Sequence, residues 1–268
     1  MIEQVKSLFK YKELLLNFAK KELKVKYKNS ALGFFWSLLN PIMMMLVFTF
    51  VFMYALEIKD PKIDIYPMFI LAGLLPWNFF NASVLGSTTS IVANGSLIKK
   101  VYFPRELLPI SIAVANLVNF ALELLVLSGF LLVIGIFNAR YLAFYKFLPF
   151  VLLLLPILFL FTLGVSLLVA ALNVYLRDIQ HLVGISLLIL FYATPIIYPF
   201  FPGTFGKYGL LILANPMASI VLSFKNALFW FKAPSFNMIA YSTTVALLTF
   251  LFGYLIFIRL EPDFAEEV

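Results

Sequence analysis

Few residues in this chain are grouped in a way that could do chemistry, and two such groups stand in short polar loops. One loop carries Lys99, Lys100 and Arg105, and the other carries Arg177 and Asp178, followed closely by the only histidine. Hydrolytic or transfer chemistry needs a nucleophile or base with converging partners, and one histidine beside one aspartate does not supply that set. Without cysteine the chain has no thiolate metal site. We therefore predict no catalytic residue, no metal site and no cofactor bound by this chain.

The first loop, residues 94–109, has the composition of a docking element. Asn94-Gly95 ends the apolar stretch before it, and the following residues can form one or two amphipathic turns before Pro104. A short helix with basic and aromatic side chains suits a groove on another protein. The alternative is a basic loop that only fixes the orientation of the chain in a membrane. The predicted docking residues are Lys99, Lys100, Tyr102, Phe103, Pro104, Arg105 and Glu106, together with Arg177 and Asp178 of the second loop.

A third polar group interrupts an apolar stretch. Asn116, Asn119 and Glu123 are spaced i, i+3 and i+7, which places them on one face of a helix. A carboxyl group inside a membrane is costly and marks a functional residue by default. Two interpretations remain open, namely proton coupling and a polar seam that faces neighbouring helices. The apolar stretches contain no Lys, Arg or His that would continue a proton relay, so the seam is favoured.

Long apolar stretches must position these residues. Hydrophobic residues make up 63% of the chain and charged residues only 12%, and the mean hydropathy is +1.01. About 20 apolar residues in a helix cross a hydrocarbon core about 30 Å thick, and in lipid the backbone must satisfy its own hydrogen bonds. We predict an all-α polytopic membrane protein with a single transmembrane domain over residues 1–268. Its six transmembrane helices, in a bundle over 34–258, are residues 34–56, 68–93, 107–137, 147–172, 182–200 and 236–258.

The N-terminal part, residues 1–30, predicts an amphipathic interface helix over residues 3–28. Apolar residues recur there at spacings of three and four among a series of lysines, which is typical of a helix lying in the membrane interface. Because Lys and Arg collect on the cytoplasmic side, both termini are predicted to be cytoplasmic, including the tail over 259–268. This topology explains the net charge of +7 without nucleic acid.

Residues 201–234 are apolar but are divided by Pro202, Gly203, Gly206 and the Asn215-Pro216 pair. Proline disfavours the helical conformation of the residue before it, so two short helical pieces are expected. We predict an outer re-entrant helical pair before the last span. The alternative is a seventh span, which would place the C-terminus outside.

Several motifs follow one another in a fixed order along nearly the whole chain. They are Leu32-Gly-Phe-Phe-Trp36 with Asn40-Pro41, Gly73-Leu-Leu-Pro-Trp77 with Phe79-Phe80, Lys99-Lys-Val-Tyr-Phe-Pro-Arg-Glu106, Asn173 through Ile179, and Thr194-Pro-Ile-Ile-Tyr-Pro199. In their order and spacing the chain resembles the membrane-spanning permeases of type-2 ABC exporters of polysaccharide, and among these the O-antigen permeases most of all. The motifs alone do not separate O-antigen export from teichoic-acid or capsule export.

The resemblance implies a homodimer of six-helix subunits in the bacterial inner membrane, together with two cytoplasmic ATP-binding subunits that hold ATP and Mg. It implies a lipid-linked polysaccharide as the cargo and membrane lipid as the surroundings. Loops 96–106 and 175–181 would couple to the ATPase. Residues 3–28 would form the interfacial helix, and residues 201–233 would form the outer re-entrant helices.

Aromatic residues gather at the ends of the predicted spans, where they can form a membrane-interface belt or stack on sugar rings. In the family that the chain resembles, spans one and five of both subunits border the polymer channel. The candidate polymer-pathway residues are Trp36, Trp77, Tyr192 and Tyr198.

Two other function classes compete with the exporter subunit. A secondary transporter would need intramembrane ion sites or repeated halves, and no convincing internal repeat is present. A membrane-embedded sugar transferase would need clustered acidic, His or Lys groups at one membrane face. The second loop is too poor in such groups for that chemistry.

Overall fold

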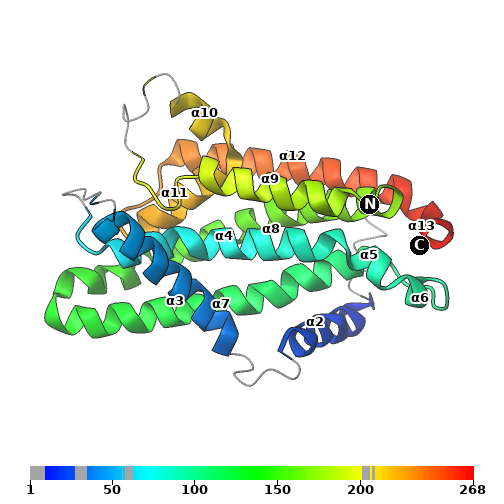
Figure 1. The fold of residues 1–268 in the computed structure, drawn as a ribbon, viewed down its shortest axis with the longest axis horizontal. Coiled ribbons are helices and arrows are strands. Elements are labelled where there is room, and N and C mark those ends of the chain that lie inside the picture. Colours follow the sequence, from blue (N-terminus) through cyan, green and yellow to red (C-terminus); the bar gives the residue numbers. More distant parts are fainter. Residues whose placement is uncertain (1–9, 28–34, 56, 58–62, 201–205, 207–208) are drawn as a thin grey trace.

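The computed structural model describes residues 10–27, 35–55, 57, 63–200, 206 and 209–268, and over these residues it is helical, without strands. The long helices run side by side along one axis, whereas α2 and α3 cross them obliquely (Figure 1). The helices are α2 Lys12–Tyr27, α3 Phe35–Thr49 with its π-helical continuation η1 Phe50–Ala55, α4 Tyr66–Thr88, α5 Ser90–Ala93, α6 Gly95–Ile98, α7 Leu107–Phe137, η2 Ala139–Ala143, α8 Phe144–Tyr175, α9 Ile179–Ala193, α10 Gly209–Ala214, α11 Pro216–Leu228, α12 Phe236–Leu260, η4 Glu261–Asp263 and α13 Phe264–Glu267.

Among the described residues, four helices are long and apolar enough to cross a membrane. They are built on α4, α7, α8 and α12, and they correspond to the second, third, fourth and sixth predicted spans. The predicted spans one and five appear as shorter apolar helices, Ile42–Ala55 and Ile179–Ala193. The structure thus confirms an all-α fold with several membrane-spanning helices.

The fifth predicted stretch, 182–200, extends too far. Helix α9 ends at Ala193, and Thr194 is extended with φ −102° and ψ 135°. The reason is Pro195, because a proline pushes the residue before it out of the helical region. Residues 194–200 therefore form an irregular connection and not the last turns of a helix.

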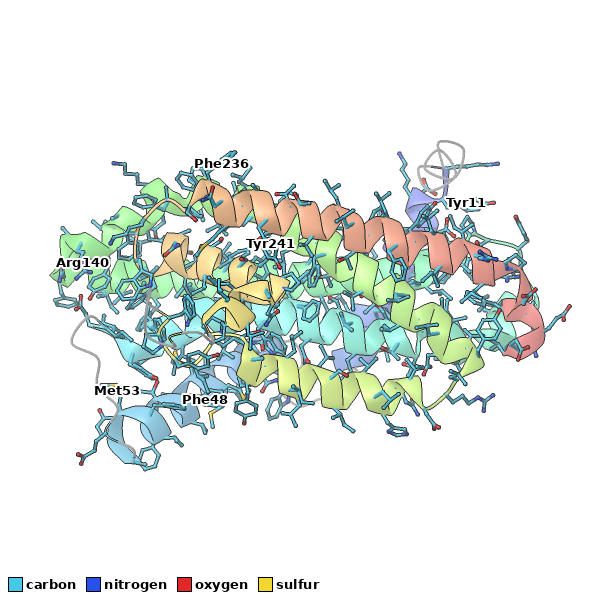
Figure 2. The ribbon with its side chains drawn as sticks, turned by 90° about the horizontal axis from the view of Figure 1, so that it is seen from above. Tyr11, Phe48, Met53, Arg140, Phe236 and Tyr241 are labelled. Carbon is cyan, nitrogen blue, oxygen red and sulfur yellow. The ribbon has the colours of Figure 1, made fainter. Side chains whose placement is uncertain are left out.

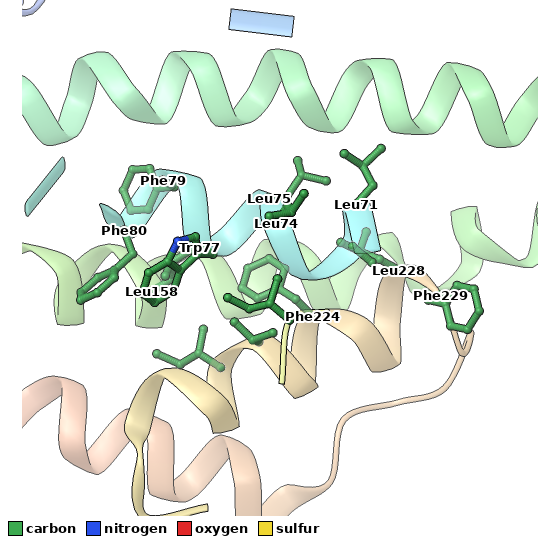
Figure 3. Packing of buried hydrophobic residues seen from close by; sticks show 14 of the residues in the cluster. Leu71, Leu74, Leu75, Trp77, Phe79, Phe80, Leu158, Phe224, Leu228 and Phe229 are labelled. Atoms are coloured by element: carbon green, nitrogen blue, oxygen red, sulfur yellow. The ribbon is translucent and has the colours of Figure 1, made fainter. Parts of the chain in front are cut away.

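Helix α4 lies at the centre of the bundle. In the most apolar stretch of α4, 78% of the residues are buried, whereas only 22% are buried in the corresponding stretches of α7 and of the helix that begins at Phe236. Figure 3 shows Trp77 of α4 beside Leu158 of α8, with Phe224 of α11 on the same side of α4. The outward faces of α7 and α12 are apolar and exposed, as lipid-facing or partner-facing helix surfaces are.

Helices α8 and α12 touch backbone to backbone. A Cβ added at Gly253 would come 2.1 Å from the carbonyl oxygen of Gly164, and a Cβ added at Gly164 would come 2.6 Å from the amide nitrogen of Phe250. Small residues allow such close approach of helices in membranes. The two helices consequently behave as one packed pair.

The segment 201–234 contains two short helices, α10 and α11, that divide at Asn215. The Asn215 side chain caps α11 by accepting the amide N–H of Met217 at 3.0 Å. Lys225 of α11, which the sequence places in an outer loop, is 1% exposed. Its Nζ donates to the carbonyl oxygens of Pro195 and Ile196, both at 2.7 Å, and lies 3.5 Å from the centre of the Phe69 ring.

Candidate functional site

The loop over residues 95–106, referred to below as the 95–106 loop, projects from one end of the bundle beside α13 (Figure 1). It follows Asn94, the residue directly after α5, whose side-chain amide donates to the carbonyl oxygen of Ser90 at 2.8 Å. The Asn94 Oδ1 in turn accepts a hydrogen bond from Lys21 Nζ of α2 at 3.0 Å. One helical turn, α6, follows, and the chain then continues without regular structure to the first residues of α7.

The tip of the 95–106 loop exposes basic and aromatic side chains together. Tyr102 is 92% exposed, and Lys99, Lys100 and Val101 are exposed beside it. These residues surround a surface hollow of about 210 Å³ whose remaining lining is Ile98, Phe103 and Arg105. An exposed ring and two ammonium groups around a shallow hollow suit contact with a complementary protein surface.

Phe103 anchors this tip from beneath. It is 4% exposed, and its ring lies 5.7 Å from the ring of Phe18 on α2. It belongs to a buried cluster with Ile98, Leu107 and Phe257. The predicted docking residues therefore divide into an exposed group at the tip and a buried group that fixes the position of the tip.

Arg105 and Glu106 belong to the inner part of the loop. The Arg105 amide N–H donates to Glu261 Oε1 at 3.2 Å, and Arg105 Nη1 donates to the Glu261 carbonyl oxygen. Glu106 is 3% exposed. The pKa of Glu106 is raised to about 7, chiefly by burial; a backbone hydrogen bond lowers this pKa, and the nearby Glu261 carboxylate raises it.

The second predicted loop lies at the same end of the molecule. Arg177 and Asp178 are exposed between α8 and α9. The hydroxyl of Tyr175, the last residue of α8, donates to the Leu260 carbonyl oxygen at the end of α12 at 3.1 Å. Since Glu261 follows Leu260 and binds Arg105, both loops lie beside the C-terminal end of α12.

The predicted aromatic pathway residues have different surroundings. Trp36 is 49% and Tyr192 58% exposed on α3 and α9, which contact each other where the rings of Phe48 and Phe191 are 5.8 Å apart. Trp77 is buried against Phe191, at a ring distance of 5.5 Å. Tyr198 is half-buried, and its hydroxyl donates to the carbonyl oxygen of Tyr192 at 3.1 Å.

The polar seam lies on α7. Asn116 and Asn119 are buried and line a hollow of about 440 Å³ between α2, α4 and α7. Asn119 Nδ2 donates to Asn116 Oδ1 at 3.4 Å. Glu123 is half-buried. In the part of the chain that the structure describes, no group of three or more His, Asp or Glu side chains could hold a metal ion.

Two features of this molecule were missed by reasoning from the sequence. One is the burial of Lys225 under the irregular segment after α9, because a lysine in a short apolar helix looks like any exposed loop lysine. The other is the packing of residues 261–268 on the 95–106 loop. A hint of the latter was present, because Phe264 interrupts an otherwise acidic run.

Comparisons with known proteins point to one protein family over most of the chain. The family model described as "ABC-2 type transporter" matches residues 13–229. The chain is 34% identical to the O-antigen export system permease protein RfbA of Myxococcus xanthus, with 100% of both chains covered. It is 32% identical to the protein of the same name from Klebsiella pneumoniae, over 95% of this chain and 94% of that one. It is 25% identical to the polysialic acid transport protein KpsM of Escherichia coli, over 85% of this chain and 86% of its relative.

Proposed function

Because the chain belongs to the ABC-2 type transporter family, we propose that it is the transmembrane subunit of a polysaccharide exporter with an O-antigen-like cargo. The single observation that carries this is the similarity over the full length to an O-antigen export permease. The cargo is a lipid-linked polysaccharide. The polysialic acid relative supports capsule export as the second candidate, with teichoic-acid export as the remaining member of that class.

The energy comes from two cytoplasmic ATP-binding subunits, which hold ATP and Mg, while this chain binds no cofactor and catalyses no reaction. The exposed tip of the 95–106 loop supports this division, because Lys99, Lys100 and Tyr102 offer a docking surface without catalytic groups. Arg177 and Asp178 lie at the same end of α12 and extend that surface. Phe103, Pro104, Arg105 and Glu106 hold the tip in place.

Two copies of the chain form the channel, with α3 and α9 of each copy at its wall. The exposure of Trp36 and Tyr192 on these helices supports the assignment. Aromatic rings contact the apolar faces of sugars while water satisfies the hydroxyl groups, so the polymer can slide. Trp77 then supports α9 from beneath and Tyr198 holds the backbone of Tyr192, a division that is supported by the contact of Trp77 with Phe191 and by the Tyr198 hydrogen bond.

The membrane is the bacterial inner membrane, and both termini face the cytoplasm, on the side of the 95–106 loop. Helices α10 and α11 form the outer re-entrant pair. Their lengths of 6 and 13 residues support this, because 13 residues span only about 20 Å at 1.5 Å per residue. A spanning helix needs about 20 residues.

The test uses inverted inner-membrane vesicles that contain the chain together with the ATP-binding subunit of an O-antigen exporter. ATP should drive a radiolabelled lipid-linked polysaccharide to the far side of the membrane. The double variant Lys99→Glu/Lys100→Glu should lose stimulated ATP hydrolysis and transport while still inserting. Lys146→Glu, an exposed lysine on the first turn of α8, is the matched control and should retain both.

Each competing function has its own outcome in these vesicles. Transport that follows an imposed ion gradient without ATP would identify a secondary transporter. Sugar transfer to the lipid without movement of the polymer would identify a membrane-embedded transferase. Full coupling in the Lys99→Glu/Lys100→Glu variant would remove the 95–106 loop from the docking surface.

A further inference from the structure

The chain folds back on itself after α12. Residues 261–268, referred to below as the 261–268 segment, form η4 and α13 and lie against the 95–106 loop at the end of the bundle (Figure 1). These two parts of the chain are 156 residues apart in sequence at their hydrogen-bonded positions. Their contact is both polar and apolar.

The polar contact joins Arg105 and Glu261 twice. The Arg105 amide N–H donates to the Glu261 side chain, and the Arg105 guanidinium donates to the Glu261 backbone. A hydrogen bond in which one partner is charged is stronger than a neutral one. Arg105 lies two residues before Leu107, where α7 begins, and Glu261 directly follows Leu260, where α12 ends. These hydrogen bonds therefore connect the start of α7 to the end of α12.

The apolar contact is made by Phe264 and Val268. Phe264 is fully buried, with its ring 5.4 Å from that of Phe257 on α12 and 6.4 Å from that of Tyr175 on α8. Val268 covers Gly95 so closely that a Cβ added at Gly95 would lie 2.1 Å from Val268 Cγ1. The 261–268 segment thereby touches both ends of the 95–106 loop.

We infer that the 261–268 segment is a positioning element that clamps the 95–106 loop to the α8–α12 pair throughout the transport cycle. The inference rests on the proposed function of the loop. Without the clamp, a push on the loop would reach the bundle only through α5, α7 and the packing of Phe103 against Phe18 and the buried cluster with Phe257. With it, the same push also reaches α12 through Glu261 and α8 through Phe264, and these two helices move together because their backbones touch at Gly164 and Gly253.

The absence of cysteine from the sequence allows a direct test. In the variant Gly95→Cys/Val268→Cys the two Cβ atoms would start about 3.3 Å apart, near the range that a disulfide requires. Mild oxidation should therefore cross-link the pair intramolecularly. The cross-linked protein should keep its ATP-driven export, because a permanent clamp does not open. Failure to cross-link, or loss of export that reduction restores, would overturn the inference.

The converse test weakens the clamp. Phe264→Ala, and separately removal of residues 264–268, should lower the amount of polysaccharide exported per ATP hydrolysed by roughly two- to thirtyfold, while the ATP-binding subunit still co-purifies. Glu266→Gln, an exposed position of α13, is the matched control and should behave as the parent chain. Unchanged export per ATP in both weakened variants would overturn the inference. If the parent chain itself exports no polysaccharide, the proposed function fails. The cross-linking yield still reports whether positions 95 and 268 are in contact.

Discussion

At the scale of single residues, Glu106 makes the base of the 95–106 loop sensitive to pH. Its pKa rises from 4.5 to about 7 in the folded protein, chiefly through burial. The folded state therefore holds this proton more tightly than the unfolded state, and the resulting stabilisation is present below about pH 4.5 and is lost as the pH rises through about 7. Arg105, Tyr254 and Glu261 are the ionisable groups around it.

The first prediction follows from the direction of the Glu106 pKa shift. The thermal midpoint of the detergent-solubilised protein should fall between about pH 5 and pH 8, and the fall should be smaller in Glu106→Gln, whose side chain stays neutral. Differential scanning fluorimetry over this range measures both proteins. An equal fall in the two proteins would assign the pH dependence to other groups.

The second prediction concerns Lys225, which holds the irregular segment after α9. Lys225→Met keeps the volume of the side chain but leaves the carbonyl oxygens of Pro195 and Ile196 without their donor. A buried polar group without a partner costs about 1–3 kcal/mol, so the thermal midpoint should drop by several degrees. Lys232→Met, at an exposed lysine, is the control. An equal drop in Lys232→Met would show that the buried hydrogen bonds of Lys225 do not account for the loss of stability.

At the scale of elements, much of the helix pattern could be predicted from the sequence. The third predicted span, residues 107–137, coincides with α7, because a long apolar run lies between Pro104 and the extended Asn138. The family predicted from the ordered motifs is confirmed. What could not be predicted is burial at the 95–106 loop. Phe103 and Glu106 are covered by α2 and the 261–268 segment, and local sequence does not reveal which distant segment folds over a loop.

The third prediction tests the contact between α8 and α12. Gly253→Ala places a methyl group against the Gly164 backbone, and such overpacking costs about 1–3 kcal/mol. The variant should lose thermal stability and should have less folded protein in the membrane. Gly129→Ala on α7 has nothing within 4 Å of the added Cβ and should be neutral or slightly more stable, since alanine favours helix. The same stability in Gly253→Ala as in the parent would show that the helices can separate there at little cost.

At the scale of the whole molecule, the fourth prediction concerns orientation. Lys232 and Glu266 are exposed at opposite ends of α12, one before its first turn and one after its last. In intact cells a membrane-impermeant thiol reagent should label Lys232→Cys and should not label Glu266→Cys until the membrane is opened. Because the parent chain has no cysteine, it is the blank. Labelling of Glu266→Cys from outside would reverse the orientation of α12 and remove the re-entrant assignment of α10 and α11.

The side-chain view, in which the long helices run across the picture, shows the two ends of the molecule (Figure 2). Arg140, which pairs with Asp64, lies at one end, and Phe236 lies towards that end at the start of α12. The 95–106 loop and the 261–268 segment lie at the other end (Figure 1). The buried polar side chains in between are spread over the bundle, for example Ser83 on α4, Asn116 on α7, Thr162 on α8 and Ser223 on α11.

The central place of α4 has a consequence for the biogenesis of the protein. Of the four long helices α4 is both the most enclosed by protein and the least apolar, and it buries Ser83, Ser87 and Thr88 in the bundle. It is synthesised before α7, α8 and α11, which enclose it. A nascent chain that stops after α5 would lack Pro109 of α7, whose carbonyl oxygen accepts the hydrogen bond of the Ser87 hydroxyl, and it would lack the helices that bury Ser83 and Thr88. We therefore expect the insertion machinery to keep α4 sheltered from lipid until α7, α8 and α11 arrive, so that these helices enter the membrane as a group.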